Sequence, residues 1–299
     1  MTNTRALDYS LVDVFTASAL AGNPLAVVMD TVGLGTEQMQ AIAREFNLSE
    51  TTFVERRSAA IEQAEGVRVR IFTTEEELPF AGHPTLGTAS VLRAQAPETL
   101  RGGIITLALN AGPIPVGFDE QDGVLFAEMT QRDPEFGVAI DPTLVAHLTG
   151  LTVDDLDPSA PPQVVSTGTA FIIVVLRSVE ALRRLSVRQA EAAATLRTHG
   201  ARWFYVLAPT GDASPAFRTR MQFNNGEDPA TGSAAGCAIS YLAARGIVPS
   251  GQRIHVRQGV EIHRPSELFL SARLAGSRVT DVRVGGSTVP VAMGQLFLP

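Results

Sequence analysis

A histidine, a serine and an aspartate lie in two short segments, each with a glycine followed by mostly small residues. His83 follows Gly82 in LPFAGHPTLGTA, Ser233 follows Gly232 in GEDPATGSAAG, and Asp228 lies in the second segment. A helix that begins at such a glycine presents unpaired backbone N–H groups and the positive end of its dipole, so it attracts anions. A histidine and a carboxylate beside a bound acid can take up and return protons. These residues therefore indicate a carboxylate site with acid–base chemistry.

The two segments belong to a repeat without gaps, in which residues 67–94 correspond to residues 217–244. Each copy reads as an alternating strand, then an acid and a proline, then glycine and small residues that open an apolar helix. The duplication predicts two similar domains facing each other across a cleft, with a small acid held from both sides. The identical pairs are Arg68/Arg218, Arg70/Arg220, Glu77/Glu227, Pro79/Pro229, Gly82/Gly232, Ser90/Ser240, Leu92/Leu242 and Ala94/Ala244.

The copies differ at the positions that could do chemistry. Leu78 corresponds to Asp228, and His83 corresponds to Ser233. A symmetric racemase would need matching acid–base groups on its two sides, so this pair favours asymmetric proton handling. The alternative is that both segments are ordinary glycine-rich turns between a strand and a helix, with Asp228 and Glu227 serving only to cap the loop.

Glu50 is a further candidate, because it lies where a predicted helix ends and the short strand 51–54 begins. Backbone on both sides would position its carboxylate more firmly than a long loop would. The alternative is a solvated glutamate at the end of a strand. The sequence pattern alone favours that alternative.

The composition limits the classes of function. The 299 residues are 45% hydrophobic, which suffices for two domains with separate cores. The net charge of −7 comes without runs of like charge, so neither nucleic acid nor a membrane is an expected partner. One cysteine excludes an intramolecular disulfide and favours the cytoplasm, and no segment is as long and apolar as a membrane span.

All 24 basic residues are arginine, which excludes a lysine Schiff base and a P-loop. The chain also lacks GxGxxG, HExxH, CxxC and GxSxG, and its remaining histidines at positions 147, 199, 255 and 263 show no mutual metal spacing. We therefore expect neither a cofactor nor a metal.

The repeat and the hydrophobic periodicity together predict an α+β fold with two pseudo-symmetric domains, each a strongly curved mixed sheet around a central helix. Asp141 is the expected N-cap of a helix with Pro142 in its first turn. We place the domain boundary between residues 135 and 136, with the last strand as a candidate to return to the first domain. Ser186 and Gln189 suggest a capping box. The predicted strands cover residues 8–15, 23–29, 104–109, 114–118, 124–130, 163–167, 170–176, 201–207, 253–256, 259–263, 267–274, 279–284 and 289–298.

The two glycine-containing segments, together with NLSETTFV, VDVFTASALAGNPLAVV and QGVEIHRPS, resemble the phenazine-biosynthesis isomerase (PhzF-like) family. The resemblance covers nearly the whole chain and implies the diaminopimelate-epimerase fold, with a cofactor-free isomerase activity in the cleft between the domains. Ser49-Glu50-Thr51 matches the family motif whose glutamate moves the proton. The resemblance also implies biosynthetic action on a small carboxylic acid and allows a homodimer.

The family pattern carries further roles onto this chain. His83 and Asp228 would assist Glu50 in catalysis, and Gly82, Gly232 and Ser233 would hold the substrate carboxylate.

Two features depart from related patterns. Epimerases of this fold use facing cysteines at positions occupied here by Ala81 and Thr231, so two-thiol racemisation is excluded, and Cys237 is expected to be a core residue. The loop at 224–226 is shorter than is common in the family, which leaves the substrate open. Two alternatives remain: an epimerase that works at one carbon without cysteines, and a non-catalytic protein that binds small carboxylates.

Overall fold

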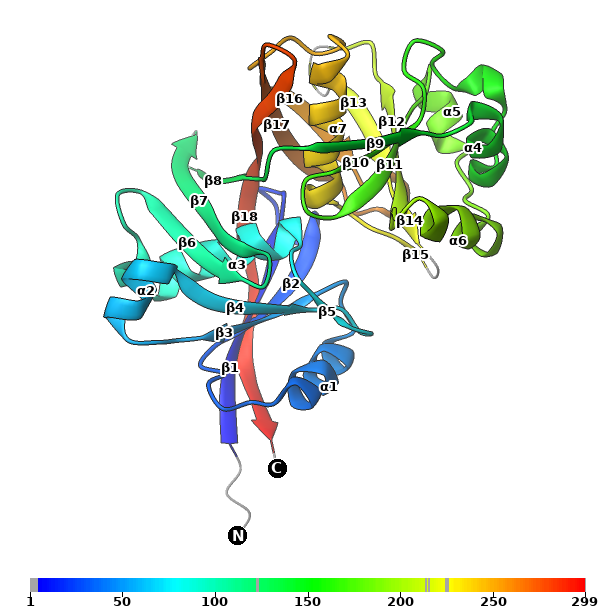
Figure 1. Cartoon of the computed structure of the whole chain (residues 1–299). Helices are drawn as coiled ribbons and strands as arrows, with labels where there is room; N and C mark the ends of the chain where they lie inside the picture. The colour runs from blue at the N-terminus through cyan, green and yellow to red at the C-terminus, as the bar shows by residue number, and fades with distance from the viewer. Residues whose placement is uncertain (1–4, 122–123, 213, 215, 224–225, 299) are drawn as a thin grey trace. The chain divides into compact units, whose positions relative to one another are not determined.

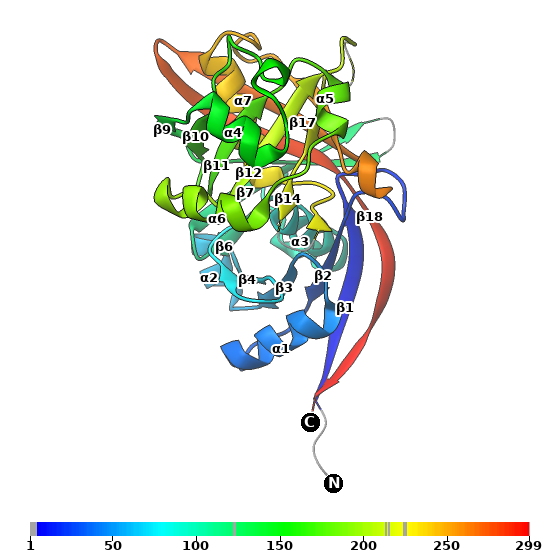
Figure 2. The same cartoon turned by 90° about the vertical axis from the view of Figure 1, so that its right-hand side faces the viewer.

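The computed structural model describes residues 5–121, 124–212, 214, 216–223 and 226–298 of the chain. These residues form two compact units (Figures 1 and 2). The first unit takes in the chain through Thr130 and again from Gly285 onward, and the second is Gln131–Val284. The long strand β18 (Arg278–Leu298) contributes residues to both units.

The first unit is a sheet that closes on itself. Its strands run in the order β1-β2-β3-β4-β6-β7-β8-β18, and β18 then pairs with β1. The pairs β2/β3 and β4/β6 are parallel, and β5 adds to the edge of β4. Its elements are β1 (Arg5–Val14), β2 (Asn23–Val28), α1 (Thr36–Phe46), β3 (Thr51–Glu55), α2 (Ala59–Glu65), β4 (Val67–Phe72), β5 (Glu77–Leu78), α3 (Gly82–Gln95), a 3-10 turn (Pro97–Thr99), β6 (Ile104–Leu109), β7 (Gly112–Gln121) and β8 (Val124–Thr130).

The strands of the second unit run in the order β18-β17-β16-β13-β12-β11-β10-β9. The parallel pairs β11/β12 and β13/β16 take the places that β2/β3 and β4/β6 occupy in the first unit. Its elements are β9 (Glu135–Ala139), α4 (Pro142–Thr149), a 3-10 turn (Val153–Asp155), β10 (Gln163–Ser166), β11 (Ala170–Val175), α5 (Val179–Arg183), α6 (Gln189–Thr198), β12 (Trp203–Pro209), β13 (Phe217–Arg220), β14 (Gln222–Phe223), β15 (Gly226–Glu227), α7 (Gly232–Ala244), β16 (Ile254–Gln258), a 3-10 turn (Val260–Ile262) and β17 (Ser266–Ala275).

Each unit has one buried central helix. Every residue of α3 from Gly82 to Leu92 is buried, as is every residue of α7 from Gly232 to Ala243. Small residues make this possible, because they let the helix approach the surrounding strands closely. An ideal Cβ on Gly87 would lie 2.6 Å from Leu25 Cδ2. The predicted α+β fold, with a curved mixed sheet around a central helix in each half, is confirmed.

Local signals predicted some elements and missed others. The Asp141 side chain accepts a hydrogen bond from the Thr143 N–H (2.9 Å), so the expected N-cap is present. The Ser186/Gln189 capping box is wrong, since α6 begins at Gln189 after an N-cap at Arg188. The predicted strand 259–263 is also wrong, because a 3-10 turn occupies that segment.

Residues 224 and 225 of the shortened loop lie outside the described residues, and Gly226 begins β15. Within the part of the chain that the structure describes, no helix has the length and apolar character needed to cross a membrane.

Candidate active site

Glu50 and His83 lie together in the first unit. Asn47 ends α1 in the left-handed conformation, with φ 51°, and turns the chain toward β3, so Glu50 directly precedes the strand at Thr51. The Glu50 Oε2 atom is 3.5 Å from His83 Nε2, and the two side chains are 17% and 4% exposed. A nearly buried carboxylate beside an imidazole can exchange protons in a place that water reaches poorly. His83 was expected to lie close to Glu50 and to assist it, and the structure places the two side chains next to each other.

The His83 ring is held deep in the first unit. Asn23 Nδ2 lies 3.2 Å from His83 Nδ1. Burial lowers the pKa of His83 to about 3, against a hydrogen bond to the Pro24 backbone that raises it. A carboxylate 3.5 Å away also favours the charged ring. Burial is the dominant effect, so the imidazole is neutral at neutral pH.

The starts of the two central helices differ in the number of N–H groups they present. No side-chain hydrogen bond caps either α3 or α7 in the described structure. In α3 the third position is Pro84, which has no N–H, whereas α7 has Ala234 there. The first turn of α7 therefore offers one more backbone donor to an anion than the first turn of α3 does.

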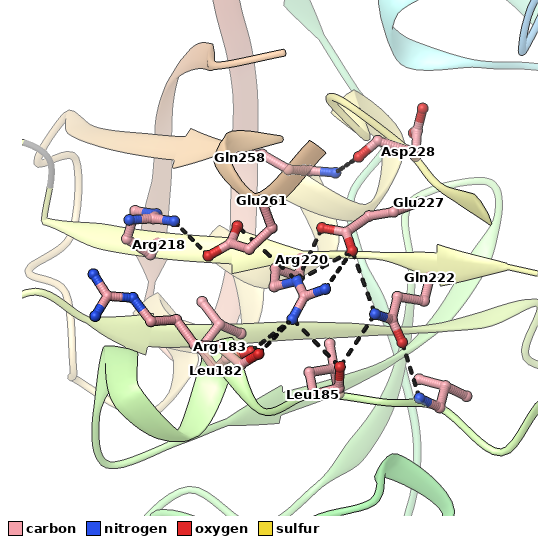
Figure 3. A network of polar contacts seen from close by, with 11 residues as sticks. Leu182, Arg183, Leu185, Arg218, Arg220, Gln222, Glu227, Asp228, Gln258 and Glu261 are labelled. Carbon is pink, nitrogen blue, oxygen red and sulfur yellow. Dashed lines mark hydrogen bonds and ion pairs between the residues drawn. The ribbon is translucent and has the colours of Figure 1, made fainter. Parts of the chain in front are cut away.

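Asp228 is buried in the second unit, just before α7. Its Oδ2 accepts a hydrogen bond of 2.7 Å from the Thr231 hydroxyl, and its backbone N–H donates to the Met221 carbonyl. Gln258 Nε2 donates to the Asp228 backbone carbonyl at 2.8 Å, as Figure 3 shows. Side chain and backbone of Asp228 are thus both fixed by neighbours within this unit.

The identical residues of the repeat hold the hairpin in front of each central helix. Arg70 pairs with Glu77 at 2.6 Å, and Arg220 pairs with Glu227 at 2.6 Å. Arg220 also donates to the backbone carbonyls of Leu182 and Arg183, which end α5, and of Leu185, which follows α5. It lies at the centre of the network in Figure 3. Glu77 and Glu227 therefore stabilise the strand that leads to the helix by pairing with arginine, rather than by capping the loop.

The remaining predicted residues fall into the two units separately. Gly82 opens α3 beside His83, while Gly232 and Ser233 open α7 and are buried. Cys237 is buried as expected, and burial raises the pKa of its thiol to about 11, so it is no nucleophile at neutral pH. Among the described residues, no group of three or more His, Cys, Asp or Glu side chains could hold a metal ion.

Comparison with known proteins identifies the family of the chain. The family model described as "Phenazine biosynthesis-like protein" matches residues 12–294. The chain belongs to this family. A trans-2,3-dihydro-3-hydroxyanthranilate isomerase of Pseudomonas aeruginosa is 37% identical over 97% of this chain and 99% of the relative. An uncharacterised isomerase of Mesorhizobium japonicum is 35% identical over 97% of this chain and 99% of the relative.

Solved structures of known proteins share the fold of this chain. The PhzF-family phenazine biosynthesis protein of Bacillus anthracis superposes with a TM-score of 0.86 at 26% identity, covering 98% of this chain and all of that one. A probable proline racemase from Agrobacterium radiobacter, at 13% identity and a TM-score of 0.64, shares the fold alone. This member of the phenazine biosynthesis-like family is an isomerase.

Sequence reasoning missed three residues of this family member that surround Asp228. Tyr205, Thr231 and Gln258 are buried polar residues, and all three belong to one chain of hydrogen bonds. Part of the signal was available, because Thr231 corresponds to Ala81 in the repeat just as Asp228 corresponds to Leu78. Gln258 lies beyond the aligned repeat, so the two copies could not reveal it, although it opens QGVEIHRPS, one of the segments that carry the family resemblance.

Proposed function

We propose that this protein is a cofactor-independent isomerase that moves a proton between two carbons of a small carboxylic acid. The observation that supports this most is the nearly buried Glu50 carboxylate 3.5 Å from the neutral ring of His83. Such a carboxylate can reach a carbon-bound proton without an intervening water layer. General acid–base catalysis of this kind contributes about 10²–10⁴-fold, and fixed hydrogen-bond donors must supply the rest.

In the proposed reaction, Glu50 removes a proton from one carbon and becomes protonated. The electron pair of the broken C–H bond moves into the adjacent unsaturated system, and a proton is returned to a different carbon. The reaction changes no oxidation state, so it needs no redox partner. His83 and Asp228 assist the proton transfers, and both act on the same substrate molecule as Glu50.

The substrate carboxylate is proposed to bind at the start of α7. The N–H groups of Gly232 and Ser233 and the helix dipole favour an anion there, while Gly82 offers similar groups at α3. In this assignment the start of α7 binds the carboxylate more strongly than the start of α3, because Pro84 removes one N–H donor from the first turn of α3. A substrate related to trans-2,3-dihydro-3-hydroxyanthranilate is the first choice, because it is the one named for a relative at 37% identity.

A test of this function uses trans-2,3-dihydro-3-hydroxyanthranilate in heavy water. The wild type should convert it and place deuterium at the carbon that receives the proton. Glu50→Gln keeps the size of the side chain and removes the base, so turnover should fall at least ~10²-fold with little change in affinity. Glu55→Gln is the matched control, because Glu55 ends the same strand and lies 3.8 Å from Arg68.

Three outcomes would contradict the proposal. If Glu50→Gln converts a proven substrate at the wild-type rate, Glu50 is not the base. If the wild type exchanges no hydrogen with solvent in any small acid that it binds, the non-catalytic carboxylate-binding function is the better description. Deuterium at the original carbon with inverted configuration would instead identify a single-carbon epimerase.

A further inference from the structure

A chain of buried hydrogen bonds leads to Asp228 within the second unit. Tyr205 Oη donates to Gln258 Oε1 (3.1 Å), and Gln258 Nε2 donates to Thr231 Oγ1 (2.9 Å). Thr231 Oγ1 in turn donates to Asp228 Oδ2 (2.7 Å). The Gln258 side chain is fully buried and uses both ends of its amide. Burial raises the pKa of Tyr205, so its hydroxyl stays a neutral donor.

The chemistry of the partners fixes the hydrogen-bond directions at Gln258 and Thr231. Gln258 Nε2 faces the Asp228 backbone carbonyl at 2.8 Å, and Gln258 Oε1 faces the Thr231 backbone N–H at 3.2 Å. A carbonyl can only accept and an N–H can only donate, so the amide has one possible orientation. Thr231 Oγ1 therefore accepts from Gln258, and its own hydrogen points to Asp228 Oδ2.

The first unit builds the same turn without these polar groups. In the first unit β5 leads into α3, and in the second unit β15 leads into α7. The two helices begin at equivalent glycines, Gly82 and Gly232. The strand β6 lies beside β4 as β16 lies beside β13, which makes position 109 the counterpart of position 258. The three counterparts are apolar: Leu78 for Asp228, Ala81 for Thr231 and Leu109 for Gln258. Folding of the turn does not require the hydrogen bonds.

Buried polar groups are costly unless they are paired, so a network that the fold does not need indicates a role in function. We propose that Thr231 and Gln258, supported by Tyr205, are positioning residues that hold Asp228 Oδ2 as a fixed acceptor. This inference rests on the proposed acid–base function of Asp228 and names the residues that position its carboxylate.

The test compares Thr231→Ala and Gln258→Leu, which install the residues of the other unit, with Thr231→Ser, which retains the hydroxyl. With trans-2,3-dihydro-3-hydroxyanthranilate as probe, Thr231→Ala should lower kcat about tenfold, the order expected for losing a hydrogen bond to a charged group. KM should change much less. The limb of the pH–rate profile that reports Asp228 should move to higher pH, because a carboxylate that loses a donor protonates more readily.

Gln258→Leu should shift the same limb in the same direction, and Thr231→Ser should restore the wild-type profile. Ser240→Ala is the stability control, since the Ser240 hydroxyl is buried in α7 and donates to the Gly236 carbonyl. It should lower thermal stability without moving the limb. A limb that moves equally in Ser240→Ala would reduce the network to a structural role.

A second measurement does not depend on turnover. Carbon-13 titration of the Asp228 carboxyl, assigned with Asp228→Asn, should give a midpoint at higher pH in Thr231→Ala than in the wild type. If the wild type fails to convert the probe but this midpoint shifts, the positioning role stands and the proposed substrate is wrong. If the midpoint and the pH–rate limb are both unchanged in Thr231→Ala, the positioning role is refuted, whatever the substrate.

Discussion

His83 should make the stability of the protein depend on pH. A group buried in its neutral form has a lower affinity for protons in the folded state than in the unfolded state. The pKa of His83 falls from 6.5 to about 3 on burial. Between these values the unfolded chain binds more protons than the folded chain. The free energy of unfolding therefore rises with pH, and the stability that the neutral His83 contributes is lost as the pH falls below 6.5.

The size of the effect follows from the two pKa values. From pH 7.5 to pH 5, linkage predicts that His83 alone lowers the free energy of unfolding by about 2 kcal/mol. Urea unfolding at these two pH values measures it directly. His83→Asn should remove about this much of the difference, whereas His147→Gln replaces a half-exposed histidine and should leave the difference unchanged.

Glu50 provides the sharpest check of this reasoning. Its carboxylate is 3.5 Å from His83 and favours the imidazolium, so it opposes the effect of burial. Because a pKa of about 3 leaves folded His83 neutral at pH 5 in any case, Glu50→Gln should leave the loss of stability between pH 7.5 and pH 5 nearly unchanged. A wild-type loss equal to that of His83→Asn would refute the assignment of a neutral, buried His83. It would instead indicate that Glu50 and His83 form an ion pair throughout this pH range.

Two further predictions concern the second unit. Arg220→Leu should destabilise the protein by about 3–5 kcal/mol in urea unfolding, because it leaves Glu227 buried without its partner. Arg70→Leu should cost clearly less, since its pair is more exposed; equal losses would contradict this. Gly236→Ala places a Cβ 1.9 Å from Gln131 Oε1 and should cost about 1–3 kcal/mol from overpacking, partly offset by about 1 kcal/mol of helix propensity. A more stable variant would show that Gln131 moves aside freely.

The repeat predicted the fold well because its identical residues determine local structure. Gly82 and Gly232 begin the two helices, and the Arg70–Glu77 pair shows why an arginine and a glutamate recur seven residues apart. The segment 259–263 failed for a local reason. Val260 and Ile262 alternate with polar residues as in a strand, but Gly259 and His263 both adopt positive φ, 75° and 58°, which ends strand geometry on both sides.

The candidate site was only partly predictable. Glu50, His83 and Asp228 carried signals in their motifs, but the 3.5 Å approach of Glu50 to His83 depends on how β3 and α3 pack. Gln258 opens QGVEIHRPS, a segment that carries the family resemblance, but nothing in that segment indicates contact with Asp228. Only the register of β16 against β13, with Thr219 opposite Gln258, brings its amide under the turn at Asp228.

The two halves divide their residues between folding and chemistry. Where the halves agree, the side chains perform structural tasks: Ser90 and Ser240 each bond the carbonyl four residues earlier in their buried helices. At the turn before the central helix, one half has apolar residues and the other has buried polar groups that cost stability unless paired. Asp228 is the clearest case, because its counterpart Leu78 fills the same position without any hydrogen-bonding requirement. An acidic group kept at such a position, with a network built to satisfy it, is better explained by proton transfer than by folding.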